Sequence, residues 1–293
     1  MQDRKRDAFF TNEKVAEECL IDAKKIIPNF TDFNFLEPSA GSGNFTTALN
    51  KLGIKKNKIL AYDIFPKSEE IIKADFLQTK IDSQIKTFSS QKKLITVGNP
   101  PFGKRSKLAI SFFNKASKFS DIICFIVPNQ FLKWSVQSKL SSDFNLIFQK
   151  KLKEDSFLLG EKIYKIKCQF QIWSRALFSQ KNLRILSPPK ISHKDFEMFQ
   201  YNNTPQARKY FDKKTYKWDF AVARQGYYDY TKKIYEEKEL NPKIQWIFFK
   251  AKSKEILAKL EQIDFQKLAE NNTMILGFGK HDVVSFYMEL YGE

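Results

Sequence analysis

Residues 33–45 read Phe-Asn-Phe-Leu-Glu-Pro-Ser-Ala-Gly-Ser-Gly-Asn-Phe, which combines a strand, a tight turn and the start of a helix. The apolar run that ends in Glu37 predicts a short β-strand, and the pattern over residues 46–52 predicts a helix behind the turn. Gly41 and Gly43 permit positive φ and let a ligand approach the backbone closely. An acid at a strand end, followed by a glycine-rich turn into a helix, is typical of a cofactor-binding loop.

Two further predicted strand ends carry acids. Residues 58–64 read as a buried strand that reaches Asp63, 20 residues after Gly43. A carboxylate at this place accepts both hydroxyls of a ribose, as in dinucleotide folds, although Asp63 taken alone is equally consistent with an ordinary turn. Residues 71–77 read as a third strand end, where Asp75 can accept a hydrogen bond from an adenine amine and Phe76 can pack on the adenine ring.

A fourth strand, residues 94–98, runs into Asn99-Pro100-Pro101-Phe102. Two consecutive prolines fix φ, remove two N–H donors and stop the strand. The Asn99 side-chain oxygen and the Pro100 carbonyl are then two acceptors beside the flat ring of Phe102, which suits a planar group that bears an amine. The alternative interpretation is a proline-rich turn after a buried strand, because Asn and Pro are ordinary turn residues.

Strands and helices alternate as far as about residue 175, which predicts an α/β fold: a doubly wound, Rossmann-like sheet with helices on both faces. Ser187-Pro188-Pro189 marks the predicted domain boundary, with a catalytic domain over residues 1–187 and a smaller α+β region over residues 188–293. Basic and aromatic residues are interleaved over 205–235. This pattern fits either a nucleic-acid-binding surface or a small aromatic core with a solvated lysine face.

The composition of the chain indicates which kinds of partner and which cellular compartment to expect. The 293 residues carry a net charge of +17, which favours a polyanionic partner such as nucleic acid, although AT-rich coding also produces many lysines. No apolar run reaches membrane-span length, and the charged N-terminus lacks a signal peptide's apolar region, so we expect neither a membrane anchor nor secretion. With only two histidines, and with Cys19, Cys124 and Cys168 widely spaced, we expect no metal centre and core thiols in a reducing, cytoplasmic compartment.

Taken in order, these motifs resemble the gamma-class DNA adenine-N6 methyltransferases of the TaqI type, over roughly residues 8–175. Phe9-Phe10-Thr11 is similar to the N-terminal cofactor motif of that family, and Asn99-Pro100-Pro101-Phe102 is similar to its catalytic tetrapeptide. The resemblance implies S-adenosylmethionine as cofactor, adenine in DNA as substrate, as in restriction–modification systems, and a C-terminal target-recognition region. It implies these cofactor-binding residues: Phe10, Thr11, Glu37, Pro38, Ser39, Ala40, Gly41, Gly43, Asp63, Ile64, Asp75, Phe76 and Asn99.

Alternatives remain open at this point. The family usually has Tyr where this chain has Phe102, and Asn-Pro-Pro-Phe is also frequent in adenine-N6 enzymes that act on RNA. A related enzyme uses Asn-Pro-Pro-Tyr to methylate a protein glutamine amide. A non-catalytic nucleic-acid-binding subunit is a fourth possibility, but its motifs would be degenerate, whereas those of this chain are intact. The resemblance also implies a second aromatic residue that packs on the target base, near Phe157 to Tyr164.

Overall fold

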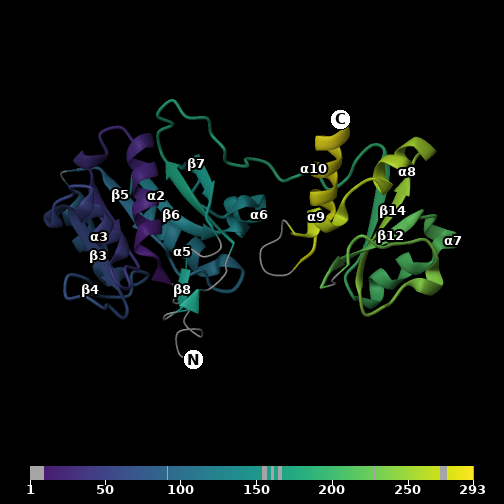
Figure 1. The fold of residues 1–293 in the computed structure, drawn as a ribbon, viewed down its shortest axis with the longest axis horizontal. Helices are drawn as coiled ribbons and strands as arrows, with labels where there is room; N and C mark the ends of the chain where they lie inside the picture. Colours follow the sequence, from purple (N-terminus) through teal and green to yellow (C-terminus); the bar gives the residue numbers. More distant parts are fainter. Residues whose placement is uncertain are drawn as a thin grey trace. The chain divides into compact units, whose positions relative to one another are not determined.

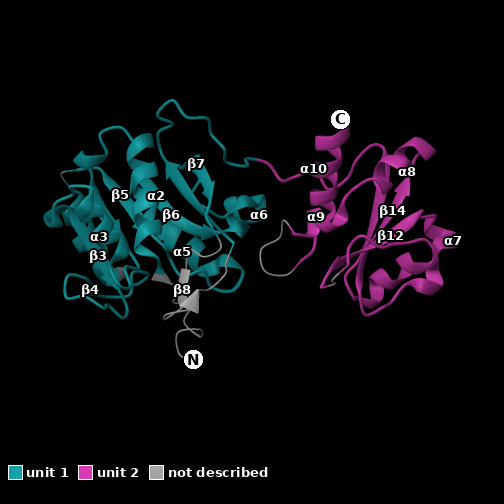
Figure 2. Ribbon diagram, in the orientation of Figure 1, with its two compact units in different colours: residues 1–186 teal, residues 187–293 magenta. Residues whose placement is uncertain are grey.

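The computed structural model describes residues 10–90, 92–153, 157–159, 162–163, 167–226, 229–270 and 276–292. The chain divides between Leu186 and Ser187 into two compact units, residues 1–186 and residues 187–293 (Figure 2). We call these unit 1 and unit 2 and describe each by itself.

Unit 1 is built on a seven-stranded sheet with the order β4-β3-β2-β5-β6-β10-β7 (Figure 1). The strands β2 to β6 are parallel, whereas β10 runs antiparallel to both of its neighbours. The strands are β2 (Asn34–Glu37), β3 (Ile59–Asp63), β4 (Ile72–Lys73), β5 (Leu94–Gly98), β6 (Ile122–Pro128), β7 (Asn145–Lys151) and β10 (Cys168–Ser174).

The strand order creates a switch point beside β2. The chain passes from β2 outward through β3 to β4 and then returns to β5 and β6 on the other side of β2. In open α/β sheets, ligands bind outside the carboxyl ends of the strands at such a point. The ends of β2 and β5, which lead into Glu37 and Asn99, therefore lie side by side where a ligand site is expected.

Helices cover both faces of this sheet, as the apolar strands require. Alternate residues of β6 face opposite ways: Ile122, Cys124 and Ile126 join one core, and Ile123, Phe125 and Val127 join the other. The first core contains α2 (Glu13–Ile26) and α3 (Asn44–Lys51). The second contains α4 (Asp82–Ser89), α5 (Lys107–Ala116) and the short α6 (Trp134–Gln137). The predicted doubly wound fold is confirmed.

A second, small sheet stands apart from the main one. Its order is β1-β8-β9, with β1 at Phe10–Thr11, β8 at Phe157–Leu159 and β9 at Lys162–Ile163. The backbone of Thr11 pairs with that of Phe157. This pairing brings the N-terminal segment of the chain next to the segment that follows β7.

Unit 2 is a four-stranded antiparallel sheet with the order β11-β14-β12-β13. The strands are β11 (Phe196–Tyr201), β12 (Phe220–Gln225), β13 (Lys233–Ile234) and β14 (Gln245–Ala251). The helices α8 (Lys254–Glu261), α9 (Phe265–Glu270) and α10 (Lys280–Tyr291) pack on one face, and a 3-10 segment over Pro205–Phe211 and α7 (Lys213–Tyr216) pack on the other. This is the smaller α+β region that the sequence predicts.

Most of the described aromatic residues over 205–235 belong to the cores of unit 2. Trp218, Phe220 and Tyr230 are buried, and Tyr210 and Tyr216 pack on the core that also contains Trp218. Tyr235 differs from them, because it is 44 % exposed. The aromatic-core interpretation is therefore correct for the rings that pack in these cores; Tyr227 and Tyr228 lie outside the described residues.

The three cysteines lie in the core of unit 1. Cys19, Cys124 and Cys168 are free and buried in the first core. Within the described ranges, none of the helices combines the length and the apolar composition that crossing a bilayer requires.

The second core of unit 1 generates a stability prediction. Ile123 of β6 is completely buried in the second core, so Ile123→Ala leaves a cavity there. This variant should lower the free energy of unfolding by about 2–5 kcal/mol, whereas Ile123→Val should lower it by only about 0.5–1.5 kcal/mol. Urea denaturation, followed by hydrogen exchange of the β5 and β6 amides, measures both variants. Equal stability of Ile123→Ala and Ile123→Val would contradict this packing.

Candidate active site

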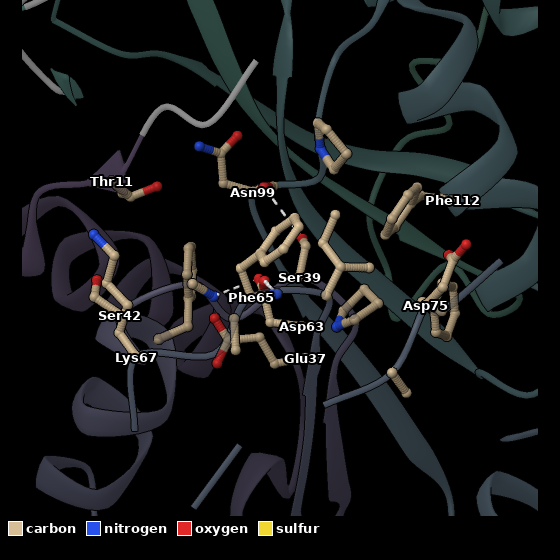
Figure 3. Close-up of a pocket in the computed structure, with 18 of the residues that line it drawn as sticks. Thr11, Glu37, Ser39, Ser42, Asp63, Phe65, Lys67, Asp75, Asn99 and Phe112 are labelled. Carbon is tan, nitrogen blue, oxygen red and sulfur yellow. Dashed lines mark hydrogen bonds between the residues drawn. The ribbon is translucent and has the colours of Figure 1, made fainter. Parts of the chain in front are cut away.

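A cavity of about 360 Å³ opens at the carboxyl ends of β2, β3 and β5 (Figure 3). Its size falls in the range of small-molecule sites, which is about 300–1,000 Å³. Most of the predicted cofactor residues line it: Thr11, Glu37, Pro38, Ser39, Ala40, Gly41, Asp63, Ile64, Asp75, Phe76 and Asn99. The topology brings these residues together from four strand ends that are far apart in the sequence.

The glycine-rich turn is held by a carboxylate. Gly41 has φ of 54° and Gly43 has φ of 82°, so both adopt the left-handed conformation that favours glycine. The N–H of Gly41 donates to Asp63 Oδ2 at 2.7 Å, and the N–H of Phe65 donates to Asp63 Oδ1 at 2.7 Å. Asp63 thus ties the turn after β2 to the end of β3, and each carboxylate oxygen keeps a further lone pair for a ligand.

Glu37 lies at the floor of the cavity and is only 1 % exposed. Its Oε2 accepts hydrogen bonds from the N–H of Thr46 at 3.1 Å and from Thr46 Oγ1 at 2.6 Å. Burial raises the pKa of Glu37 to about 8; the hydrogen bonds from Thr46 oppose this rise, and the charge of Asp63 adds to it. At neutral pH, Glu37 therefore keeps its proton in the free protein.

Asp75 and Phe76 close the far side of the cavity, next to β4. Asp75 is exposed, and its Oδ1 accepts from the N–H of Leu77 at 2.9 Å, which fixes the carboxylate in a turn. Phe76 is buried, and its ring packs against Phe112 of α5 with 5.4 Å between the centroids. Part of the Phe76 side chain reaches the cavity, while the rest belongs to the second core.

The turn after β5 brings Asn99 and Pro101 to the cavity. Ser39 Oγ donates to the carbonyl oxygen of Asn99 at 3.3 Å, which links the glycine-rich turn to this one, and the side-chain oxygen of Asn99 is buried beside the cavity. Pro100 is buried and Phe102 is half-buried against the first core. Neither of these two residues is among the described residues that line the cavity.

Thr11 contributes a buried hydroxyl. It is 6 % exposed and lines the cavity, and its Oγ1 has no hydrogen-bond partner among the described residues. The Thr11 carbonyl accepts from Asn44 Nδ2 at 2.6 Å, which holds β1 against the start of α3. Phe9 lies outside the described residues, the side chain of Phe10 is not described, and Tyr164 is likewise outside. The expected second aromatic residue stays a prediction.

Some residues that line the cavity were not predicted from the sequence. Phe65 is 53 % exposed and Leu108 is 39 % exposed, and both line the cavity with Ile64, which is 50 % exposed. The position of Phe65, two residues after Asp63, was an available signal. Leu108 and Phe112 come from α5, and only the packed fold places them at this edge. Large apolar side chains that stay exposed around a cavity indicate a ligand surface.

Comparison with known proteins places the chain in a family. The sequence profile of the EDM2 methyltransferase-like domain matches residues 39–195, so unit 1 has a Rossmann-like methyltransferase fold and the chain belongs to the EDM2 methyltransferase-like domain family. No sequence among curated proteins is significantly similar to this chain.

Two solved structures are among those that match this chain. A proposed RNA methyltransferase from Pyrococcus horikoshii is 19 % identical, with a TM-score of 0.38; the match covers 57 % of this chain and 86 % of the other. A proposed class I S-adenosylmethionine-dependent methyltransferase from Listeria monocytogenes is 13 % identical, with a TM-score of 0.37; the match covers 62 % of this chain and 63 % of the other.

The methyltransferase fold implies S-adenosylmethionine as methyl donor, and the cavity residues fit this group. The donor is a cation with a ribose and an adenine, and the cavity offers Asp63, Asp75, the exposed apolar side chain of Ile64 and the unpaired hydroxyl of Thr11. No group of three or more His, Cys, Asp or Glu residues placed to hold a metal ion occurs in the part of the chain that the structure describes.

Glu37 generates a pH prediction. Because its pKa is raised from 4.5 to about 8 in the folded protein, the stability tied to its bound proton is complete below pH 4.5 and is lost as the pH rises toward 8. Glu37→Gln keeps a neutral acceptor for Thr46, so the variant should become more stable relative to the wild type between pH 5 and pH 8. Urea denaturation at both pH values checks this, and a difference in stability that does not change with pH would contradict it.

Proposed function

We propose that the protein transfers a methyl group from S-adenosylmethionine to the exocyclic N6 amine of adenine in DNA. One observation carries the proposal: Asn99, Asp63 and Asp75 line the same cavity. Ser39 of the glycine-rich turn donates a hydrogen bond to the carbonyl oxygen of Asn99, which connects the two turns that border this cavity. A two-acceptor turn beside a nucleoside-sized site is the arrangement that methyl transfer to a planar amine needs.

The order of the strands suggests how the donor lies. Asp75 follows β4, Asp63 ends β3, and Thr11 belongs to β1 on the opposite side of the cavity (Figure 3). In the proposal, Asp75 accepts from the adenine amine, Ile64 and Phe76 contact the adenine ring, and Asp63 accepts from the ribose hydroxyls. When bound, S-adenosylmethionine supplies an electrophilic methyl group on a sulfonium centre.

Asn99 and Pro100 act on the acceptor. In the proposal, the Asn99 side-chain oxygen and the Pro100 carbonyl each accept a hydrogen bond from one N–H of the amine. These two hydrogen bonds reduce the conjugation of the nitrogen lone pair with the ring and direct the lone pair into the cavity. The new N–C bond forms as the S–C bond breaks, and the extra proton on nitrogen leaves to solvent. Positioning and electrostatics supply the catalysis, so no strong general base is required.

The adenine must leave its stack to reach this turn, because its amine is inaccessible inside a duplex. Phe102 follows this turn and is half-buried against the first core. In the proposal, its ring stacks on the adenine. In the proposal, residues 1–187 form the catalytic domain and residues 188–293 form the target-recognition region. Phe102, where the DNA enzymes of the TaqI type usually have Tyr, favours adenine in RNA as the second candidate substrate.

A transfer assay tests the proposal. The full chain is incubated with methyl-labelled S-adenosylmethionine and, separately, with adenine-containing DNA, RNA and a protein pool, and the products are digested and identified. The proposal predicts labelled N6-methyladenine in DNA. Label in RNA alone would select the second candidate, and label in neither nucleic acid would overturn the proposal.

Asn99→Ala separates catalysis from cofactor binding. Because the side chain removed is one of the two acceptors, transfer should fall by at least about 100-fold, while the dissociation constant for S-adenosylmethionine, measured by calorimetry, should change by less than about threefold. Asn57→Ala is the matched control, because Asn57 is exposed near the start of β3, at the opposite edge of the sheet. Transfer by Asn99→Ala at the rate of the control would exclude the proposed role of this turn.

A further inference from the structure

The positive charge is divided unequally between the two units. Residues 1–186 contain 32 lysines and arginines against 18 aspartates and glutamates, whereas residues 187–293 contain 18 against 15. Nearly all of the net charge of +17 therefore belongs to unit 1. Within unit 1, residues 92–139 hold nine basic residues and a single acid, Asp121.

Four of these nine basic residues follow the carboxyl ends of β5 and β6. Lys104, Arg105 and Lys107 are exposed and follow the carboxyl end of β5, directly after the Asn99 turn. Lys133 follows the carboxyl end of β6. The carboxyl ends of parallel strands meet at one edge of the sheet, so all four residues lie at the edge that holds the cavity.

Hydrogen bonds connect the segments that carry these residues. Ser106 Oγ donates to Gln130 Oε1 at 2.5 Å, which joins the loop after β5 to the segment after β6. The N–H of Asn129 donates to the carbonyl of Lys167, which joins that segment to the start of β10. The segments that follow β5 and β6 and the segment that enters β10 are therefore joined to one another at this edge of the sheet.

The loop after β5 has a fixed and unusual shape. Gly103, Arg105 and Ser106 have φ of 66°, 55° and 60°, and two of these three are not glycine. Non-glycine residues avoid this conformation unless their surroundings impose it, and such residues cluster at functional sites. Buried Ser106 anchors the loop through Gln130, so the exposed basic side chains project from a preformed backbone.

Trp134 adds an aromatic surface at the same edge. Of the four tryptophans, Trp173, Trp218 and Trp246 are buried, whereas Trp134 is only partly buried, next to Lys133. Basic side chains that follow a backbone, with an aromatic ring for the bases to stack on, are the components of a single-strand binding surface. Most of the described aromatic residues of unit 2 pack in its cores instead.

We propose that the basic edge, defined as Lys104, Arg105, Lys107, Lys133 and Trp134, binds the phosphodiester backbone of an unpaired nucleic-acid strand next to the target base. This inference rests on the proposed function, because it names the surface that brings a nucleic acid to the Asn99 turn. In this proposal, opposite charges lie at different parts of the cavity edge. The acids Asp63 and Asp75 face the cationic donor at the ends of β3 and β4, and the basic edge holds the polyanion at the ends of β5 and β6.

Salt-dependent binding of an adenine-free, 20-nucleotide, single-stranded DNA, without S-adenosylmethionine, tests the basic edge. The variant replaces Lys104, Arg105 and Lys107 with Gln. Position 105 therefore still carries a non-glycine side chain, so the flexibility of the backbone is not increased there. Losing three phosphate contacts should make the slope of log K against log salt less negative by about 2. Fluorescence anisotropy at several salt concentrations measures this slope.

A matched triple variant serves as the control. It replaces with Gln the three residues Lys55, Lys92 and Lys93, which are exposed in unit 1 before the starts of β3 and β5, at the opposite edge of the sheet. This control should keep the wild-type slope. A change in its slope equal to that of the basic-edge variant would overturn the proposal, because the attraction would then be a property of net charge alone.

Trp134 supplies a second readout. The oligonucleotide should quench the intrinsic fluorescence of the wild type, and Trp134→Phe should abolish the quenching; quenching that persists in Trp134→Phe would place the strand elsewhere. The binding assay contains neither adenine nor donor, so its result does not depend on methyl transfer. If the basic edge binds this probe but the transfer assay shows no methylation of adenine, the proposed function is wrong and the basic edge stands. If adenine is methylated but the basic-edge variant keeps the wild-type slope, the basic edge is wrong and the proposed function stands.

Discussion

The carboxylate of Asp63 is the constraint on which the site depends. It accepts from the backbone of Gly41 on one side and from that of Phe65 on the other, and so holds the glycine-rich turn against the end of β3. Ser39, on the same turn, bonds to the carbonyl of Asn99. Asp63 and Ser39 together therefore connect the ends of β2, β3 and β5 around the cavity.

The sequence predicted this part of the site because its signals are local. Each of Glu37, Asp63 and Asn99 follows a short β-prone run, and parallel strands that end together bring such residues to one edge. Leu108 and Phe112 were not predicted as cavity residues, because their place depends on how α5 packs across the sheet. The half-buried position of Phe102 against the first core depends on the same long-range packing.

Composition alone could not decide the role of the aromatic residues over 205–235. A sequence in which lysines alternate with aromatic residues is the same pattern whether the rings stack on nucleic-acid bases or fill a protein core. The pairing of β12 with β14 decides between the two, because it buries Phe220 on one face of the sheet, while Trp218 packs with Phe248 on the other. The net charge favoured a polyanionic partner at the level of composition, and the division of the chain into two units shows that most of this charge lies in unit 1.

The most direct test of the central claim is calorimetric titration of the full chain with S-adenosylmethionine, repeated with Asp63→Ala. The account predicts saturable binding at one site, competed by S-adenosylhomocysteine. It also predicts a loss of affinity of at least about tenfold in Asp63→Ala, because charged hydrogen bonds to the ribose are removed and the glycine-rich turn is released. Absence of binding by the wild type, or equal affinity in the variant, would contradict the account.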